Sequence, residues 1–173
     1  MSFSIRRLTR DDVSAYRAIR LEALTNHPEA YASSPESFAA RSDDEVASLL
    51  EQMAFFGVFA AGTLAGIVAF GQTRGERDRH RGWLYQVYVQ PQLRGTGAAA
   101  ALLEAAIEQA GTDVLQVHLM VGAHNAPAIR LYEKLGFVTY GTDPRCLAVN
   151  GRYIDEHMMV RMLDAAPGKT ENE

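Results

Sequence analysis

Residues 87–103 read VYVQPQLRGTGAAAALL, a run that passes from an extended segment through a glycine-bearing loop into an alanine-rich segment. Its β-branched and aromatic start is typical of a strand, Pro91 ends that strand, and the alanines after Gly97 favour a helix. The small residues between the two elements leave backbone N–H groups uncovered at the helix N-terminus. Such a loop predicts a binding site for a pyrophosphate, to which Arg94 adds a positive charge.

Two other interpretations of this loop compete with a pyrophosphate site. A tight turn between a strand and a helix uses glycine only for its backbone angles. Residues 95–100 also fit the pattern G-x-G-x-x-G/A of nicotinamide-dependent oxidoreductases. In that pattern the next strand ends in an Asp or Glu that holds the ribose, whereas the strand predicted over 114–121 runs into Gly122. The missing acid disfavours the dinucleotide interpretation.

A second segment, residues 125–137, reads NAPAIRLYEKLGF. Asn125 is a favourable N-cap and Gly136 a favourable left-handed C-terminal cap, so the segment predicts a helix over 126–135. Tyr132 falls on the same face as the apolar residues of that helix. The sequence predicts a half-buried phenol there, either a core tyrosine bonded to a backbone acceptor or a functional group.

Together the two segments resemble the GNAT superfamily of acetyl-CoA-dependent N-acetyltransferases. Residues 94–99, RGTGAA, stand where that family has its Q/R-x-x-G-x-G/A loop, with Ala in the last position. Residues 125–137 match its N-x-x-A-x-x-L-Y-x-x-x-G-F helix in every fixed position. The resemblance covers roughly residues 3–163 and extends to small bacterial members whose acceptors are mostly unassigned.

The resemblance implies an α/β (α+β) fold, a GNAT-like single domain over residues 1–164 followed by a flexible tail at 165–173. Its central sheet is mixed, mostly antiparallel, of about six to seven strands, splayed between the fourth and fifth strands and flanked by about four helices. The residue patterns place its elements along the chain. They predict a strand over 4–8, helices after the caps Thr9 and Ser42, a hairpin of 55–60 and 64–70, strands over 83–89 and 114–121, a helix over 96–110, a turn at 143–145, and final strands over 137–140 and 152–163.

The resemblance also implies how acetyl-CoA, the cosubstrate, binds. In the family the pantetheine arm lies between the splayed strands and behaves as an added strand. The backbone of Val87, Tyr88 and Val89 is expected to bind the pantetheine, and Asn125 is expected to bind the cosubstrate near its thioester. The pyrophosphate is expected to bind to the loop formed by Arg94, Gly95, Thr96, Gly97, Ala98 and Ala99. No metal is expected.

Acetyl transfer to an amine needs a base, a donor to the oxyanion and an acid for the departing thiolate. The resemblance assigns Tyr132 as the acid and the N–H of Val87 as the oxyanion donor. Many relatives carry a carboxylate where this chain has Tyr85 and Gln86, so the base stays open. The candidates are Glu22, His124, Asp155, Glu156, His157 and a water chain to bulk solvent. For the acceptor we expect Glu22, Tyr31 and Arg145 to line its site, on the segments 22–34, 143–145 and 150–156.

Composition narrows the partners and the compartment. The net charge of −4 and the pI near 5.7 disfavour nucleic acid, which binds clustered positive charge. The single cysteine, Cys146, offers neither a disulfide nor a zinc site and favours a reducing compartment. No apolar run reaches the roughly 18 residues of a membrane span, so we expect a cytoplasmic protein that does not bind membranes.

The sequence therefore predicts an N-acetyltransferase for a small-molecule or peptide amine, acting as a monomer or a homodimer. One alternative to catalysis stays open, a silent acyl-CoA-binding module that acts as a sensor. The dinucleotide-binding oxidoreductase is the other, less favoured alternative.

Overall fold

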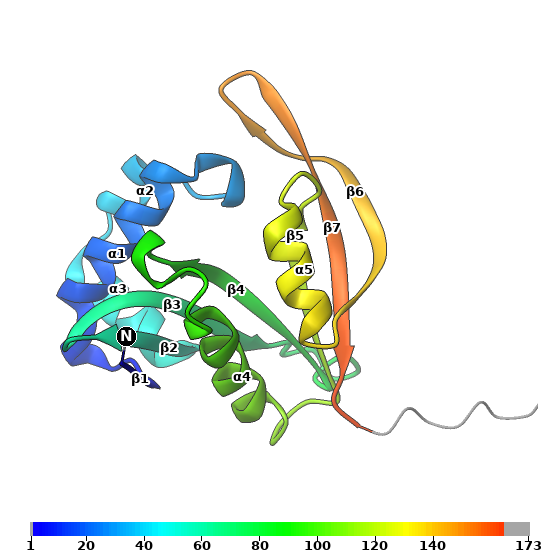
Figure 1. The fold of residues 1–173 in the computed structure, drawn as a ribbon, viewed down its shortest axis with the longest axis horizontal. Helices are drawn as coiled ribbons and strands as arrows, with labels where there is room; N and C mark the ends of the chain where they lie inside the picture. The colour runs from blue at the N-terminus through cyan, green and yellow to red at the C-terminus, as the bar shows by residue number, and fades with distance from the viewer. Residues whose placement is uncertain (1, 165–173) are drawn as a thin grey trace, which may run out of the picture.

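The structure, a computed structural model, describes residues 2–164, and the predicted tail at 165–173 lies outside this range. The described strands are β1 (Phe3–Arg7), β2 (Ala54–Ala60), β3 (Thr63–Gln72), β4 (Arg81–Val89), β5 (Gln116–Gly122), β6 (Val138–Val149) and β7 (Arg152–Met162). They form one sheet in the order β1-β2-β3-β4-β5-β7-β6 (Figure 1). Only β4 and β5 pair in parallel, which confirms the predicted mixed, mostly antiparallel sheet.

Five α-helices lie within residues 2–164, one more than the sequence predicts. They are α1 (Val13–Asn26), α2 (Pro35–Ala39), α3 (Asp43–Gln52), α4 (Ala98–Ala110) and α5 (Ala126–Lys134), with short 3-10 turns η1 (Arg10–Asp12), η2 (Pro28–Ala30) and η3 (Pro91–Leu93). The additional helix is α2, whose cap Ser34 accepts a hydrogen bond from the N–H of Ser37. None of the helices in the described part of the chain is both long and apolar enough to cross a membrane.

The helices cover the sheet on both faces, because neighbouring strand residues point to opposite sides. Phe55 and Ile67 pack under α1, α2 and α3, while Phe56 and Val68 pack under α4. The α5 helix joins the second of these cores through Tyr132 and lies beside β5 and β7, away from α1–α3 (Figure 1). Each core is apolar and buried, so the sheet is held between two helical layers.

The sheet opens between β4 and β5. Only three residue pairs join these strands, the last of them Trp83 with His118, and beyond that point the strands diverge (Figure 1). A bulge lies where the divergence begins, because Gln86 has a positive φ of 56° and the register with β3 shifts between Ile67 and Ala69. The predicted splay between the fourth and fifth strands is confirmed.

The prediction of a turn at residues 143–145 is wrong. This segment lies inside β6, where the pairing with β7 is interrupted between Asp143 and Leu147. Arg145 has a φ of 56°, and its N–H donates to the Asp155 carboxylate at 2.8 Å. A bulge therefore accommodates Pro144 within the strand. The strand predicted over 137–140 is only the beginning of β6.

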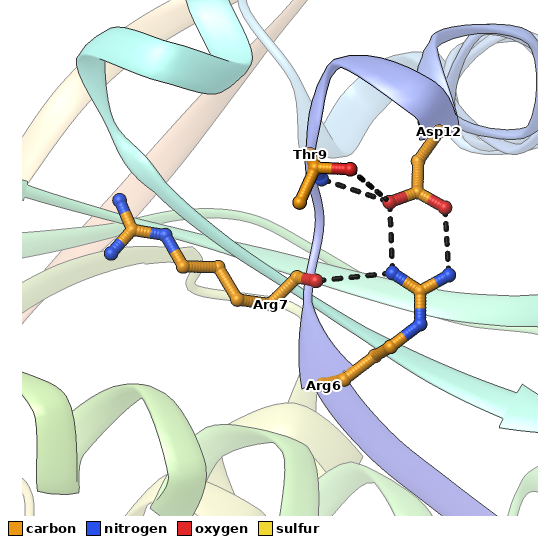
Figure 2. Close-up of polar contacts among 4 residues, drawn as sticks. All are labelled: Arg6, Arg7, Thr9 and Asp12. Atoms are coloured by element: carbon orange, nitrogen blue, oxygen red, sulfur yellow. Dashed lines mark hydrogen bonds and ion pairs between the residues drawn. The ribbon is translucent and has the colours of Figure 1, made fainter.

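The entry into α1 is fixed by a carboxylate. Asp12 accepts hydrogen bonds from both Arg6 Nη atoms at 2.8 Å and from the backbone N–H of Thr9 at 2.8 Å (Figure 2). The hydrogen bonds from Arg6 are the main reason that the pKa of Asp12 lies below its usual value. These contacts join β1 to the 3-10 turn η1 that leads into α1. The predicted cap Thr9 stands at the N-cap of η1, whereas Asp12 is the N-cap of α1.

Replacing Asp12 with Ala should lower the free energy of unfolding by about 2 kcal/mol at pH 7, since charge-assisted hydrogen bonds are lost. The folded-state pKa is depressed, so this stabilisation is complete above the unfolded-state pKa of about 3.9 and is lost as the pH falls through the folded-state pKa. Urea denaturation at pH 7 and at pH 3 should therefore show a difference that shrinks in acid. Asp11→Ala, at an exposed neighbour, is the control, and equal losses in both variants would contradict the argument.

Candidate functional site

The divergence of β4 and β5 opens a cleft of about 1910 Å³. Single small-molecule sites commonly measure about 300–1,000 Å³, so this cleft has room for a long ligand and a second one beside it. Its lining includes residues of β3, β4, β5 and β7, of the loop before α4, of the start of α5 and of the segment around η2. The two predicted motif segments thus meet in one place.

The loop before α4 carries unpaired backbone donors. Gly95 and Gly97 have φ angles of 76° and 86°, and the hydroxyl of Thr96 donates to the Leu93 carbonyl oxygen at 2.7 Å. These turns aim the backbone outward, and no atom lies within 4 Å of where a Cβ would stand on either glycine. Within residues 2–164, four N–H groups here have no hydrogen-bond partner, those of Gly95, Gly97, Ala99 and Ala100. The loop can bind an anion through its backbone.

The predicted contribution of this loop differs from residue to residue. The N–H of Thr96 donates to Leu93 at 3.3 Å, and that of Ala98 lies 3.4 Å from the Thr96 hydroxyl, so neither is free. The exposed guanidinium of Arg94 lies at the cleft, with Nη2 3.4 Å from His27 Nε2. A positive side chain therefore stands beside the free N–H groups.

The start of α5 forms the opposite wall of the cleft. Asn125 caps the helix, because its Oδ1 accepts from the N–H of Ala128 at 3.3 Å. This bond leaves the Nδ2 group of Asn125 available as a donor. Asn125 and Ala128 both line the cleft, together with Tyr132, which lies one turn beyond Ala128.

Tyr132 has features of both predicted alternatives, a core tyrosine and a functional group. Its ring packs edge-on against Phe137 at a centroid distance of 6.0 Å, and only 6% of the residue is exposed. The residue nevertheless lines the cleft, and its hydroxyl has no hydrogen-bond partner among residues 2–164. Burial raises the pKa of this phenol, so the proton stays on it at neutral pH.

Two tyrosines hold the bulge of β4. The hydroxyl of Tyr31 donates to the Val87 carbonyl oxygen at 2.9 Å, and that of Tyr16 donates to Oε1 of Gln86 at 2.7 Å. Burial raises the pKa of Tyr31 to about 12, so this donor also stays protonated. The segment after α1 is thereby fastened to the strand at the point where β4 leaves β5.

Of the three predicted acceptor residues, the structure brings only Tyr31 into the cleft. The Glu22 carboxylate accepts from the hydroxyl of Tyr88 at 2.7 Å and from Nε2 of Gln90 at 2.8 Å, and it does not line the cleft. Arg145 lies outside the cleft, with its guanidinium 5.3 Å from the ring centroid of Tyr153. Glu22 is occupied in joining α1 to the end of β4, a pairing that the sequence pattern does not reveal.

Two of the five residues proposed as a base line the cleft, Glu156 and His124. Glu156 is only 8% exposed, and its carboxylate accepts from the thiol of Cys146 at 3.1 Å. Burial, and after it the Glu156 carboxylate, raise the pKa of Cys146 to about 12, which keeps the thiol a donor. The remaining candidates, Glu22, Asp155 and His157, do not line the cleft.

Arg20 is a cleft residue that the sequence analysis does not select. It lies on α1 between Tyr16 and Ala23, on the face that packs against the sheet, and only 5% of it is exposed. A charged residue within an apolar stripe was the available signal, because buried charges are rare unless they are paired. The structure adds what the pattern lacks, which is that this side chain also lines the cleft.

Residues 16–137 match the model of the acetyltransferase (GNAT) family. The chain belongs to the GNAT family. Its relatives include a mycothiol acetyltransferase of Thermobispora bispora, 34% identical over 136 residues, which are 76% of this chain and 45% of that protein. A second relative is an L-methionine sulfoximine/L-methionine sulfone acetyltransferase of Pseudomonas aeruginosa, 37% identical over 61% of this chain and 62% of its own length. The chain thus spans less than half the length of the first relative.

A solved acetyltransferase structure has the same fold. The structure of a putative acetyltransferase from Salmonella typhimurium with its cofactor acetyl-CoA has a TM-score of 0.82, at 25% identity, and the match covers 98% of this chain and 99% of that one. The predicted GNAT membership and fold are confirmed. The dinucleotide alternative requires a doubly wound parallel sheet, which the single parallel pair does not provide.

Proposed function

We propose that this chain transfers the acetyl group of acetyl-CoA to a primary amine by direct attack in a ternary complex. The observation that carries the proposal is the cleft itself, which joins the free N–H groups before α4 to the unpaired hydroxyl of Tyr132. An anion site and a proton donor thus face one space, bordered by the part of β4 that no longer pairs with β5. We also propose that the acetyltransferase domain spans residues 1–164 and that the protein is cytoplasmic.

The pyrophosphate of acetyl-CoA would bind to the N–H groups of Gly95, Gly97 and Ala99 at the positive end of α4, with Arg94 supplying an ionic contact. The pantetheine arm would follow the backbone of residues 87–89, where β5 no longer pairs with β4. A linear amide-bearing chain in that position replaces the missing strand partner. Asn125 would donate its free amide near the thioester.

Three groups act on the reacting atoms in this proposal. The amine lone pair attacks the thioester carbon, and the N–H of Val87 donates to the carbonyl oxygen as it gains negative charge. When the C–S bond breaks, the departing thiolate takes the proton of Tyr132. The attacking amine loses a proton to Glu156, to His124 or to a water chain, since the first two line the cleft.

The relatives differ in the compound that their names give. The two relatives named above carry different compounds in their names, mycothiol and L-methionine sulfoximine or sulfone. We propose a small-molecule or peptide amine, with a monomer or a homodimer as the active form. The side chains around the acceptor end of the cleft must determine which chemical class of amine binds.

The proposal predicts CoA release that depends on an added amine. Purified chain should be incubated with acetyl-CoA and a panel of amino acids, polyamines, antibiotics and peptides, with detection of the free thiol. A ternary complex predicts intersecting lines in double-reciprocal plots of initial rates, whereas an acetyl-enzyme intermediate gives parallel lines. Acetyl-CoA binding without thiol release for any amine would contradict the proposal and favour the silent sensor module.

A further inference from the structure

Arg20 carries a charge that the described residues do not neutralise. Its Nη1 is buried and has no hydrogen-bond partner within residues 2–164. The charged or ionisable groups that act on its guanidinium are Tyr16, Tyr31 and Arg41, none of which is a carboxylate. Burial lowers the pKa of Arg20, which is the expected effect of removing a cation from water without an anion beside it.

The contacts of Arg20 within the protein do not satisfy its donors. Its guanidinium lies 4.5 Å from the ring centroid of Tyr31, a cation–π contact that uses the face of the group and none of its N–H bonds. The other arginine near it, Arg41, repels it. Isolated buried cations destabilise folded proteins, so a role in folding gives no reason for this arrangement.

Arg20 lies at the acceptor end of the cleft. Tyr31, against which it stacks, donates to the carbonyl of Val87, and Tyr16, one turn earlier on α1, donates to Gln86. Both strand residues belong to the bulge, where the proposed function puts the thioester. A group bound by Arg20 would therefore belong to the acceptor, because the pyrophosphate has its own site in the loop before α4.

We propose that Arg20 binds a carboxylate of the acceptor, so that the acceptor is a small amine that also carries an acidic group. This inference rests on the proposed function for the identity of the acetyl donor. Arg20 reaches the cleft lining, a planar guanidinium can hold a carboxylate through two N–H groups, and the ring of Tyr31 lies against its face. The acceptor supplies the anion that the protein lacks at this position.

The experiment compares matched pairs of acceptors. Each pair consists of an amine with a carboxylate a few bonds away, as in α-, β- and γ-amino acids, and its primary carboxamide, which keeps the amine and loses the charge. We expect kcat/KM to favour the carboxylate by about tenfold or more in the wild type, the size of one charge-assisted contact. In Arg20→Met this preference should disappear through a higher KM, while the Kd of acetyl-CoA stays unchanged.

Arg17→Met is the matched control, because Arg17 lies on α1 outside the cleft and holds the carbonyl oxygens of Arg41 and Ala39. It removes an arginine from the same helix and should keep the preference for the carboxylate. The melting temperature separates binding from packing, since removal of an unpaired buried cation should leave Tm unchanged or raise it. A fall in Tm of Arg20→Met as large as that of Arg17→Met would assign Arg20 to the core and overturn the inference.

Binding is also measured without acetyl-CoA, from the increase in Tm that each amine produces. A larger increase with the carboxylate than with the carboxamide, lost in Arg20→Met, supports the inference even if turnover is absent. Equal rates and equal increases for both members of every pair would overturn it. Turnover of neutral amines or polyamines alone would also overturn it and leave the proposed acetyltransfer intact, whereas failure to bind acetyl-CoA would count against the proposed function.

Discussion

Gly97→Val is expected to weaken acetyl-CoA binding at least tenfold, about 1.4 kcal/mol. Gly97 precedes α4 with a φ of 86°, and the space where its Cβ would stand is open. A phosphate that approaches the free N–H groups of the loop would fill that space, so a valine side chain would block the approach. The valine also opposes the left-handed backbone that aims these groups at the cleft. Isothermal calorimetry with acetyl-CoA measures the loss.

The control for this substitution is Gly62→Val. Gly62 has a φ of 79°, no atom lies within 4 Å of its Cβ position, and it lies in the β2–β3 turn outside the cleft. Both variants therefore impose similar backbone strain, and both should lower Tm to a similar extent. Only the Gly97 variant should lose affinity. Unchanged affinity in a folded Gly97→Val would remove the pyrophosphate from this loop.

The sequence predicts the parts of the site that depend on local structure. The loop at 94–99 and the helix capped by Asn125 are visible because glycine, proline and cap residues act on their immediate neighbours. The cap Ser42 and the hairpin of 55–60 and 64–70 are predicted for the same reason and are present. Each of these features is decided within a few residues.

Features that depend on distant pairing are not predicted from the residue pattern. The Glu22 carboxylate accepts hydrogen bonds from Tyr88 and Gln90, which lie 66 and 68 residues further along the chain. The long β6 is a similar case, because Asp143 and Pro144 favour a turn locally while the pairing with β7 keeps the segment extended. Tertiary contacts override local preference at both places.

The residue pattern does not predict the divergence of β4 and β5, which is implied only by the resemblance to a family. The bulge at Gln86 lies just beyond the last β4–β5 pair, and Tyr16 of α1 bonds to it over a separation of 70 residues. The same helix places Arg20, two positions before Glu22, in the lining of the cleft. An acidic residue that faces the acceptor was predicted on this helix, whereas the side chain that lines the cleft is basic. Helical phase, which depends on how α1 packs, decides between them.

Tyr132→Phe should reduce kcat by about 100-fold, the usual size of one general-acid contribution, with little change in the Kd of acetyl-CoA. Phenylalanine keeps the ring that packs against Phe137 and removes only the hydroxyl. Since that hydroxyl has no protein partner within residues 2–164, its loss should not lower Tm. Single-turnover rates with saturating acceptor, under conditions where chemistry limits turnover, measure the effect.

The pH dependence gives a second test of the same residue. An acid is active while it is protonated, and burial raises the pKa of Tyr132 above its usual value near 10, so ionisation of this phenol should cause no loss of kcat below about pH 10. Tyr140→Phe is the control, because it removes a hydroxyl that bonds to His118 outside the cleft and should leave kcat unchanged. Thiolate is a fair leaving group even without a proton, which sets an upper limit to the loss in Tyr132→Phe. Equal turnover in Tyr132→Phe and wild type would place Tyr132 in the core alone, and the thiolate would then have to leave without a proton from the protein or take it from water.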